Sequence, residues 1–405
     1  MVLTQEAAGE HGLQLIRRLL LCASAVDSRD FISAAHSLLH LYRNVSVSGD
    51  PFQRVAAYFT DGLAARILTA NSPFYTSIMA KPSPADEFAA FTAFYRDSPY
   101  YQFAHFTANQ AIIEAFEEAA DSNGGSLHVV DFDVGYGLQW PSLIQSLSDM
   151  ATRENPISLK ITGFGRGSAE LRETETRLSG FAAGCRNLRF EFEGRMKNQE
   201  QSMIIKVNQN ATLAVNLVFY LHTLKNYAEI SSALQLINAM NPSIVTLVEK
   251  EGTCRKNQPG FLSRFMEYLH FFAAMFDSLE DCLPAESKER LEIERNHLGM
   301  EIKEAVLLAR GGVGEGEGLN CESLERWKEV MRKNGFEGKA MSSRSVSQAK
   351  LLLKIKNHCS AMAEHGSLTG FRISERDEGK AISLGWQYRH LITATAWRPL
   401  TALEV

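Results

Sequence analysis

Long apolar runs are scarce in this sequence of 405 residues, and none approaches the roughly 20 residues that a membrane-spanning helix requires. Arg17 and Arg18 do precede an apolar stretch, LLLCASA, as in a secretory signal. That stretch is short, follows the acidic Glu6 and Glu10, and has the apolar spacing of an amphipathic helix. We therefore expect neither a membrane span nor a cleaved leader.

Closely spaced cysteines are also missing. The six cysteines are scattered along the chain, without a C-x-x-C pair or a nearby histidine at metal-ligand spacing: Cys22, Cys185, Cys254, Cys282, Cys321 and Cys359. They are typical of small core residues or surface thiols in a reducing compartment. We expect no metal site and no disulfide framework.

Positive charge is not in excess, since the formal net charge is −5 and the pI is about 6.2. An acidic chain is poorly suited to bind phosphate tightly by itself, although a local basic groove could act against the net field. The candidates for DNA contact lie in the last third of the chain: Lys328, Arg332, Lys333, Lys350 and Lys354, with Lys356 beside them. On amphipathic helices such charges are more often the solvated face.

The first part of the chain shows helical periodicity only. Apolar residues three and four apart predict helices from Leu13 to Val26, Phe31 to Tyr42 and Phe52 to Leu68, with Asp30 and Asp50 as N-caps. The pattern continues through two further helices to about Ala120. We therefore expect a short tail at 1–11 and a helical cap at 12–121.

From Leu127 the pattern changes to alternating strands and helices. Strands are predicted at Leu127 to Asp131, Ile157 to Thr162, Leu188 to Glu193, Thr212 to Tyr220 and Ile244 to Val248. Phe371 to Glu375 and Ala381 to Trp397 are predicted to form a C-terminal hairpin around RDEGK. The fold class is α/β: a methyltransferase-like Rossmann core at 122–405, with a parallel sheet, an antiparallel hairpin and a flexible loop at 309–320.

The first strand runs into a glycine turn, DFDVGYG, where a methyltransferase-like sheet binds its nucleotide. Asp131, Gly135 and Gly137 fit a D-x-G-x-G-x-G spacing, but Asp133 replaces the first glycine. Gly163 and Phe164 follow the second strand, where a ribose-binding acid belongs. Both departures favour a vestigial turn, and we expect no cofactor and no enzyme activity.

At this point several motifs together resemble one family. LHVVD, formed by Leu127, His128, Val129, Val130 and Asp131, resembles the VHIID motif of the plant GRAS (scarecrow-like) regulators. Asn241 to Glu251 with Pro242, Ser263 to Glu280 and Glu289 to Ile302 resemble the three parts of the PFYRE motif. Trp327 and Gly335, then Trp386 and Trp397, are spaced as in the SAW motif, although Thr395 replaces its usual serine.

The resemblance implies a nuclear transcriptional regulator with a helical cap on a Rossmann-like core. It also implies that the protein acts by binding other proteins, namely other GRAS proteins and DNA-binding zinc-finger factors. Phe94 to Phe116 looks most like the scarecrow-like group that contains the nodulation signalling pathway 2 protein, which implies symbiotic or strigolactone signalling. The helical region begins almost at once, so we expect little of the variable activating arm that precedes it in the family.

Two features remain open between packing and partner binding. The stripe of Leu13, Ile16, Leu19 and Leu20 could form a dimer face or pack onto neighbouring cap helices. The helix Phe261 to Leu279 has more apolar residues than one stripe needs, so a second face could meet a partner.

Two other functions remain as alternatives. A sequence-specific DNA-binding factor predicts a basic groove between cap and core, and binding that falls steeply with salt. A methyltransferase or other small-molecule binder predicts a cofactor-sized cavity above Asp131 to Gly137.

Overall fold

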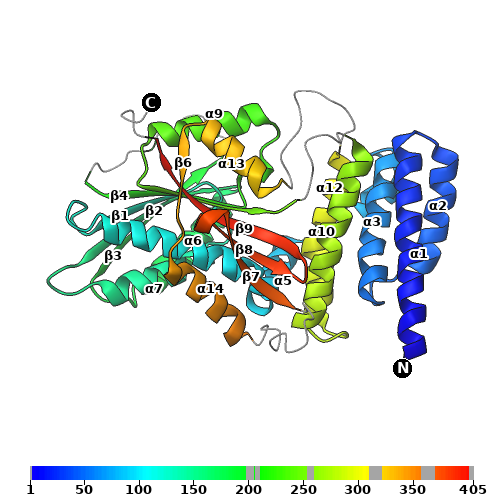
Figure 1. Cartoon of the computed structure of the whole chain (residues 1–405), viewed down its shortest axis with the longest axis horizontal. Helices are drawn as coiled ribbons and strands as arrows, with labels where there is room; N and C mark the ends of the chain where they lie inside the picture. The colour runs from blue at the N-terminus through cyan, green and yellow to red at the C-terminus, as the bar shows by residue number, and fades with distance from the viewer. Residues whose placement is uncertain are drawn as a thin grey trace.

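The computed structural model describes residues 2–197, 205, 210–252, 260–309, 322–356 and 370–400, with side chains from residue 12 onward. A block of helices stands at one end of the molecule, and a twisted sheet wrapped in helices fills the other (Figure 1). Among the described helices, none is both long and apolar enough to cross a bilayer. The loop predicted at 309–320 lies, apart from Ala309, outside the described residues.

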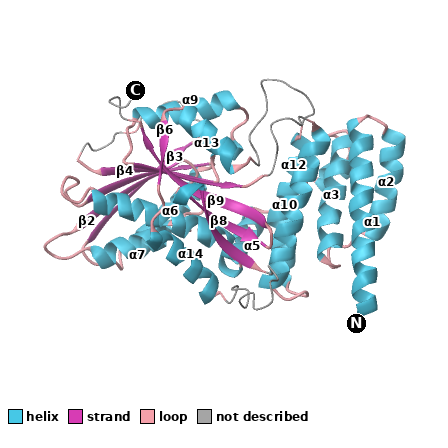
Figure 2. Ribbon diagram, in the orientation of Figure 1, coloured by secondary structure: helices cyan, strands magenta, loops and turns pink. Residues whose placement is uncertain are grey.

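One nine-stranded sheet forms the core, and it confirms the predicted fold class (Figure 2). The strand order is β3-β2-β1-β4-β5-β9-β8-β7, with β6 also paired to β9. The first five strands are parallel: β1 (Ser126–Asp131), β2 (Ile157–Gly165), β3 (Leu188–Met196), β4 (Thr212–Val218) and β5 (Ile244–Lys250). The rest are antiparallel: β6 (Phe336–Lys339), β7 (Phe371–Arg376), β8 (Ala381–Trp386) and β9 (Arg389–Pro399).

The C-terminal hairpin differs from its prediction. Ala381 to Trp397 was expected as one arm, but Gln387 turns the chain with φ +50° and divides it into β8 and β9. β8 and most of β9 are buried, so the alternation of polar and apolar residues that would reveal the break is absent. β9 then pairs with β5 and joins the meander to the parallel strands.

Helices cover both faces of the sheet. Leu127 and Val129 of β1 pack towards α6 (Pro99–Glu118), α7 (Trp140–Met150) and α8 (Ser168–Ala182), and α14 (Ser343–Ile355) lies against α6. Val130 packs on the opposite side, with α9 (Tyr227–Ala239) and α13 (Leu324–Lys333). In Figure 1, α9 and α13 lie above the sheet, and α6, α7 and α14 lie below it.

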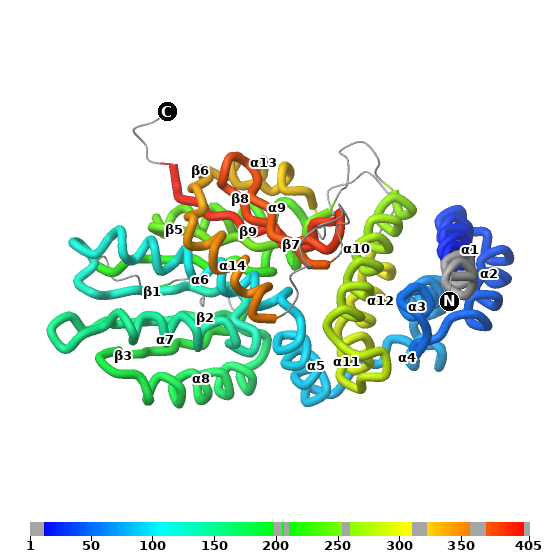
Figure 3. Tube along the Cα trace, turned by 60° about the horizontal axis from the view of Figure 1, so that its bottom comes forward, coloured from blue at the N-terminus to red at the C-terminus, as the bar shows by residue number. Residues whose placement is uncertain are grey.

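The helical cap combines two distant segments of the chain. The first supplies α1 (Val2–Asp27), α2 (Phe31–Asn44) and α3 (Pro51–Ile67), so residues 2–11, predicted as a tail, continue the first helix. The second supplies α10 (Phe261–Cys282), α11 (Lys288–Ile293), a π-helical turn (Glu294–Leu298) and α12 (Gly299–Leu308). α10 and α12 stand between the N-terminal helices and the core (Figure 3), whereas the sequence placed them within the core at 122–405. The short α4 (Pro73–Ile78) and α5 (Pro84–Asp97) lead back to the sheet.

The wide apolar surface of α10 is shared between cap and core. Its Phe265 packs edge-on against Phe59 of α3, with ring centroids 5.2 Å apart. The helix also contacts β8 and β9, and Met275, Phe276 and Leu279 are fully buried. The second face, which could have met a partner, therefore lies largely against the sheet.

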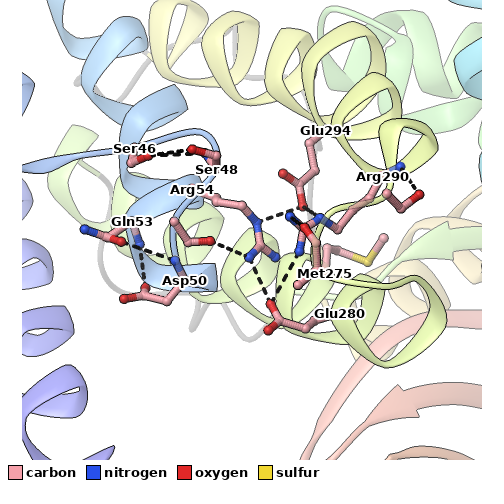
Figure 4. Close-up of polar contacts among 12 residues, drawn as sticks. Ser46, Ser48, Asp50, Gln53, Arg54, Met275, Glu280, Arg290 and Glu294 are labelled. Atoms are coloured by element: carbon pink, nitrogen blue, oxygen red, sulfur yellow. Dashed lines mark hydrogen bonds and ion pairs between the residues drawn. The ribbon is translucent and has the colours of Figure 1, made fainter. Parts of the chain in front are cut away.

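A buried ion network joins the two cap segments (Figure 4). Arg54 of α3 donates through Nε to Glu294 Oε1 at 3.0 Å and through Nη1 to Glu280 Oε2 at 2.9 Å. Arg54 and Glu294 are 1% and 0% exposed, and Arg290 Nε approaches the same Glu294 oxygen at 3.8 Å. Charged groups this deep require partners, because water no longer solvates them. The network fixes the start of the π-helical turn against α3.

Candidate functional site

A cleft of about 600 Å³ lies where the parallel strands end and the cap begins. Its lining comes from the turn after β1, the ends of β4 and β5, α5, α6, and the segment from the π-helical turn into α12. This is the position predicted for a ligand in an open α/β sheet, and the volume is within the usual range for small-molecule sites. The cavity expected above Asp131 to Gly137 by the small-molecule alternative is therefore present.

Asp131, at the end of β1, is buried and holds the turn together. Its Oδ1 accepts from Asn216 Nδ2 at 3.1 Å and from the Asp133 backbone N–H at 3.2 Å, and its Oδ2 accepts from Trp140 Nε1 at 3.1 Å. Burial raises the pKa of Asp131 to about 7, and the donated hydrogen bonds oppose that rise. The lone pairs of this carboxylate are thus directed to the protein itself.

The two glycines of the turn have left-handed backbone, with φ +48° at Gly135 and +71° at Gly137. A Cβ on Gly137 would stand 2.7 Å from Thr174 Cγ2, so this position also needs glycine to let α8 approach. Asp133 turns its carboxylate to Lys197, with Nζ to Oδ2 at 2.8 Å. The turn keeps the shape of a nucleotide loop, with an ion pair added.

The end of β2 does not fit a nucleotide. Gly163 and Phe164 occupy the place where ribose hydroxyls need a carboxylate, and Phe164 is buried and stacked on Phe132 at 5.3 Å between centroids. Tyr220 packs on Phe132 in turn, at 5.2 Å. These rings pack against one another in the core, and the end of β2 offers no carboxylate for ribose hydroxyls, so the residues present do not suit S-adenosylmethionine.

The opposite wall of the cleft is aromatic. Phe219, which follows β4, is half-buried and stacks on Tyr100 with centroids 5.6 Å apart and planes 4° apart. Tyr101 Oη lies 2.8 Å from His297 Nε2, and His105 lines the same wall. Burial lowers the pKa of His105 to about 3 and that of His297 to about 4, so both imidazoles are neutral near pH 7. Sequence reasoning missed these residues, and the aromatic density of Phe94 to Phe116 was the available signal.

Ion pairs connect the cap and the core around the mouth of the cleft. Lys250 at the end of β5 pairs with Glu301 of α12, and Arg166 after β2 approaches Glu87 of α5 at 3.4 Å. The Arg166–Glu87 pair is exposed and contributes at most about 1 kcal/mol, whereas Lys250 and Glu301 are partly buried, at 13% and 32% exposed. Their main effect is to neutralise the side chains that a charged ligand would meet.

His128 belongs to another environment. Its Nε2 lies 2.9 Å from Thr162 Oγ1 on β2, and burial lowers its pKa to about 4. It does not line the cleft with Asp131. The pair therefore forms no catalytic constellation.

The remaining motif residues are structural. Gly335 has φ +82° after α13, and Phe336 behind it is fully buried, as the predicted helix end requires. Trp386 donates through Nε1 to Asp277 Oδ2 at 2.6 Å, and Trp397 donates to Thr395 Oγ1 at 2.8 Å. The side chains of Pro242 and Trp327 are buried.

The four leucine-stripe residues have different environments. Leu13 is 69% exposed, Ile16 and Leu20 are half-buried against the cap, and Leu19 is fully buried within it. Leu19 therefore packs inside the cap, which leaves Leu13 facing solvent.

The candidate DNA contacts divide between the two faces of the sheet, because α13 and α14 lie on opposite sides. Lys328 is held by Asp377 at 2.5 Å and by Glu325 at 3.0 Å, Lys333 pairs with Glu329 at 2.9 Å, and Lys350 lies 3.5 Å from Glu375. Lys356 donates to the Arg96 carbonyl. Arg332 and Lys354 are exposed. These residues do not form one basic groove.

Within the described residues, no group of three or more histidine, cysteine or acidic side chains could hold a metal ion. Cys22 is a free thiol buried in the cap, and Cys185 and Cys282 are free and partly buried. Cys254, Cys321 and Cys359 lie outside the described residues.

The GRAS domain family model matches residues 15–398. Protein SCARECROW of Ipomoea nil is 34% identical over 98% of this chain and 48% of its own length, and Protein SCARECROW of Arabidopsis thaliana is 33% identical over 96% and 56%. The GRAS family protein RAD1 of Lotus japonicus is 33% identical over 96% and 74%. The crystal structure of SCL7 from Oryza sativa matches with a TM-score of 0.73 and 27% identity, covering 95% of this chain and 99% of that one. This chain spans about half the length of the SCARECROW proteins that it matches.

Proposed function

This chain belongs to the GRAS domain family, whose matched relatives are SCARECROW-like regulators of plants, and from that premise we propose that it acts in the nucleus as a non-enzymatic transcriptional co-regulator. It works by binding other proteins, namely GRAS partners and DNA-binding zinc-finger factors. Its pathway is symbiotic, strigolactone-related or developmental signalling.

The observation that carries this proposal is a set of exposed, large apolar side chains on the first two helices of the cap. Leu13 and Leu21 on α1 are 69% and 52% exposed, and Ile32 and Leu39 on α2 are 75% and 53% exposed. The solvent face of an amphipathic helix is normally polar, so large apolar side chains there indicate a surface that another protein covers. We call Leu13, Leu21, Ile32 and Leu39 the cap surface, and we assign it to a second GRAS domain.

The distribution of charge supports contact with DNA through partners. Lys328, Lys333 and Lys350 are paired with carboxylates, and the net charge is −5. Phosphate binding depends on free lysine and arginine side chains that release counterions from DNA. The DNA-binding alternative has less support, because three of its five candidate residues are paired with carboxylates and the five lie on opposite faces of the sheet.

The test measures binding to the GRAS domain of a SCARECROW protein by titration calorimetry, with wild type and the variants Leu13→Glu and Ile32→Glu. Ile32 lies in the first turn of α2, where a carboxylate suits the helix dipole, so folding should be preserved. Leu351→Glu is the matched control, since Leu351 is 53% exposed on α14, away from the cap surface. We expect the cap variants to lose at least about tenfold in affinity and the control to lose none.

A second measurement titrates a labelled promoter fragment at two salt concentrations, with and without the partner. Weak binding without sequence preference by the chain alone, and specific binding with the partner, is the expected result. Specific, steeply salt-dependent binding by the chain alone would establish the DNA-binding alternative instead. Unchanged affinity in both cap variants would exclude the cap surface.

A further inference from the structure

The cleft between cap and core has a wall of mutually packed rings. The ring centroids of Phe91 and Tyr101 are 4.7 Å apart, those of Phe91 and Tyr136 are 5.2 Å apart, and those of Tyr101 and Phe219 are 5.4 Å apart. All four rings line the cavity of about 600 Å³. Rings fixed by one another present a rigid apolar surface, which is a common feature of small-molecule sites.

The backbone at Phe219 is strained. Its φ is +54°, in the left-handed region, where a bulky residue is a clear outlier and the strain is about 1–3 kcal/mol. The other described non-glycine residues with such backbone are Arg29, Asn187, Asn241, Asp377, Glu378 and Gln387, all polar. Phe219 N–H donates to the Val248 carbonyl at 2.9 Å, which locks the ring at the cleft wall. Strain of this kind is concentrated at binding and catalytic sites.

A second rare conformation shapes the facing wall. The π-helical turn Glu294–Leu298 brings Asn296 and His297 to the cleft, and π-helical turns occur frequently at functional sites. Its first residue, Glu294, is held by Arg54, so the turn has a fixed position. On the α6 side, buried His105 has no hydrogen-bond partner for Nδ1 among the described residues. Because Nδ1 of His105 has no hydrogen bond among the described residues, neither neutral tautomer of this imidazole is favoured by a partner at that nitrogen.

The charges around the cavity select against anions. Lys81, Arg166 and Lys250 are its cations, against the carboxylates of Glu87, Asp133, Glu301 and Glu304 and the buried Asp131. Lys250 pairs with Glu301, and Arg166 with Glu87. Among the described residues Lys81 alone of these cations has no ion pair, so a phosphate or carboxylate could meet Lys81, but it would have to break a pair to reach Arg166 or Lys250 and would face more acids than cations.

We propose that the cleft binds an uncharged, ring-containing and largely apolar small molecule, stacked against Phe219 and Tyr101 and able to form a hydrogen bond with the neutral imidazole of His105 or His297. The ligand lies between cap and core, with α12 forming one side of its entrance. This function is independent of the cap surface. It makes the chain a receptor for a small molecule, without catalysis.

The test uses a matched pair of fluorescent probes on the intact chain. N-phenyl-1-naphthylamine is uncharged, and 8-anilinonaphthalene-1-sulfonate carries the same ring skeleton with an added sulfonate. We expect the neutral probe to bind with one site per chain, and the sulfonate at least about tenfold more weakly. Met300→Trp fills the cleft from α12, and Leu308→Trp is its control, because Leu308 lies on the same helix and is 64% exposed.

Met300→Trp should reduce affinity for the neutral probe at least about tenfold, while Leu308→Trp leaves it unchanged. If Met300→Trp lowers the melting temperature, Glu304→Trp replaces it, because Glu304 is exposed at the rim and its substitution disturbs no packing. Absence of saturable binding, equal binding of both probes, or binding that the folded cleft variants leave intact would each overturn the proposal. The last result would place the probe elsewhere, such as on the cap surface.

Discussion

Replacement of Glu294 by Gln should destabilise the cap strongly. The substitution keeps the size of the side chain but removes the carboxylate that lies 3.0 Å from Arg54 Nε, leaving a guanidinium that is 1% exposed. Glu280 remains as a partner, but its side chain is 40% exposed, so water screens that pair. A buried charge left without its partner typically destabilises by about 3–5 kcal/mol.

The expected change in melting temperature follows from the chain length. An unfolding entropy of about 2.1 cal/mol/K per residue gives about 0.85 kcal/mol/K for the whole chain, so 3–5 kcal/mol corresponds to roughly 4–6 °C. Glu280→Gln is the control, since its loss should be below about 1 kcal/mol, or roughly 1 °C. The double variant Arg54→Met/Glu294→Leu removes both of these charges and should recover part of the loss, because buried Arg290, 3.8 Å from the same Glu294 oxygen, still loses that carboxylate.

Circular dichroism melts of the four proteins test this reasoning. It predicts that Glu294→Gln melts well below wild type and that the double variant melts between the two. A Glu294→Gln melt within about 1 °C of wild type would show that the network is not buried as described. A double variant as unstable as the single one would show that packing and hydrogen bonds, rather than an unpaired charge, account for the loss.

Three further predictions concern the core. Burial lowers the pKa of His128 from 6.5 to about 4, so the stability of the neutral, buried imidazole is present above pH 6.5 and is lost as the pH falls towards 4. Urea unfolding at several pH values should show that the free energy of unfolding falls by about 1.4 kcal/mol per pH unit in this window and that His128→Gln removes this slope. Equal slopes in the two proteins would contradict the prediction. Gly335→Ala should lower the free energy of unfolding by about 1–2 kcal/mol, because φ is +82° and the new Cβ would lie 2.9 Å from Asn238 Nδ2. Gly180→Ala, within α8, meets nothing within 4 Å and should raise it by about 0.5–1 kcal/mol. Similar melting temperatures for the two variants would refute the backbone argument. Millimolar S-adenosylmethionine should leave the melting temperature unchanged, because Gly163 and Phe164 leave the end of β2 without a carboxylate for the ribose hydroxyls, and a clear rise would reinstate the methyltransferase alternative.

Local signals in the sequence predicted local structure well. Asp50 caps α3 by accepting from the Gln53 N–H at 2.9 Å, with Pro51 in the first turn, as expected from the residue types. Gly335 and Phe336 end α13 as predicted, because a left-handed residue and an apolar contact are sufficient to stop a helix. The five parallel strands were identifiable for the same reason, since apolar runs between glycine, proline and polar turns mark buried strands.

Features that depend on distant residues were not predictable. The strand β6 has only four residues, Phe336 to Lys339. It forms because these residues pair with β9, which lies about 60 positions later in the chain. The Arg54–Glu294 pair joins residues 240 positions apart, and no periodicity within α3 or the π-helical turn reveals it. The glycine turn was found from its spacing, but the facing wall of the cleft comes from α5, α6 and the π-helical turn, which only the folded chain brings together.

The two-segment cap has a consequence for the order in which the protein is made. A ribosome adds about 5–20 residues per second, so the 240 residues between Arg54 and Glu294 take roughly 12–48 seconds to synthesise. Within that interval α10 is made only near the end, and α12 is made after it, so for most of the time α3 lacks the helices that cover Phe59 and Val55, which are fully buried in the finished protein. The emerging chain must therefore be protected from aggregation, and the helices of the first cap segment are among the last to reach their final packing.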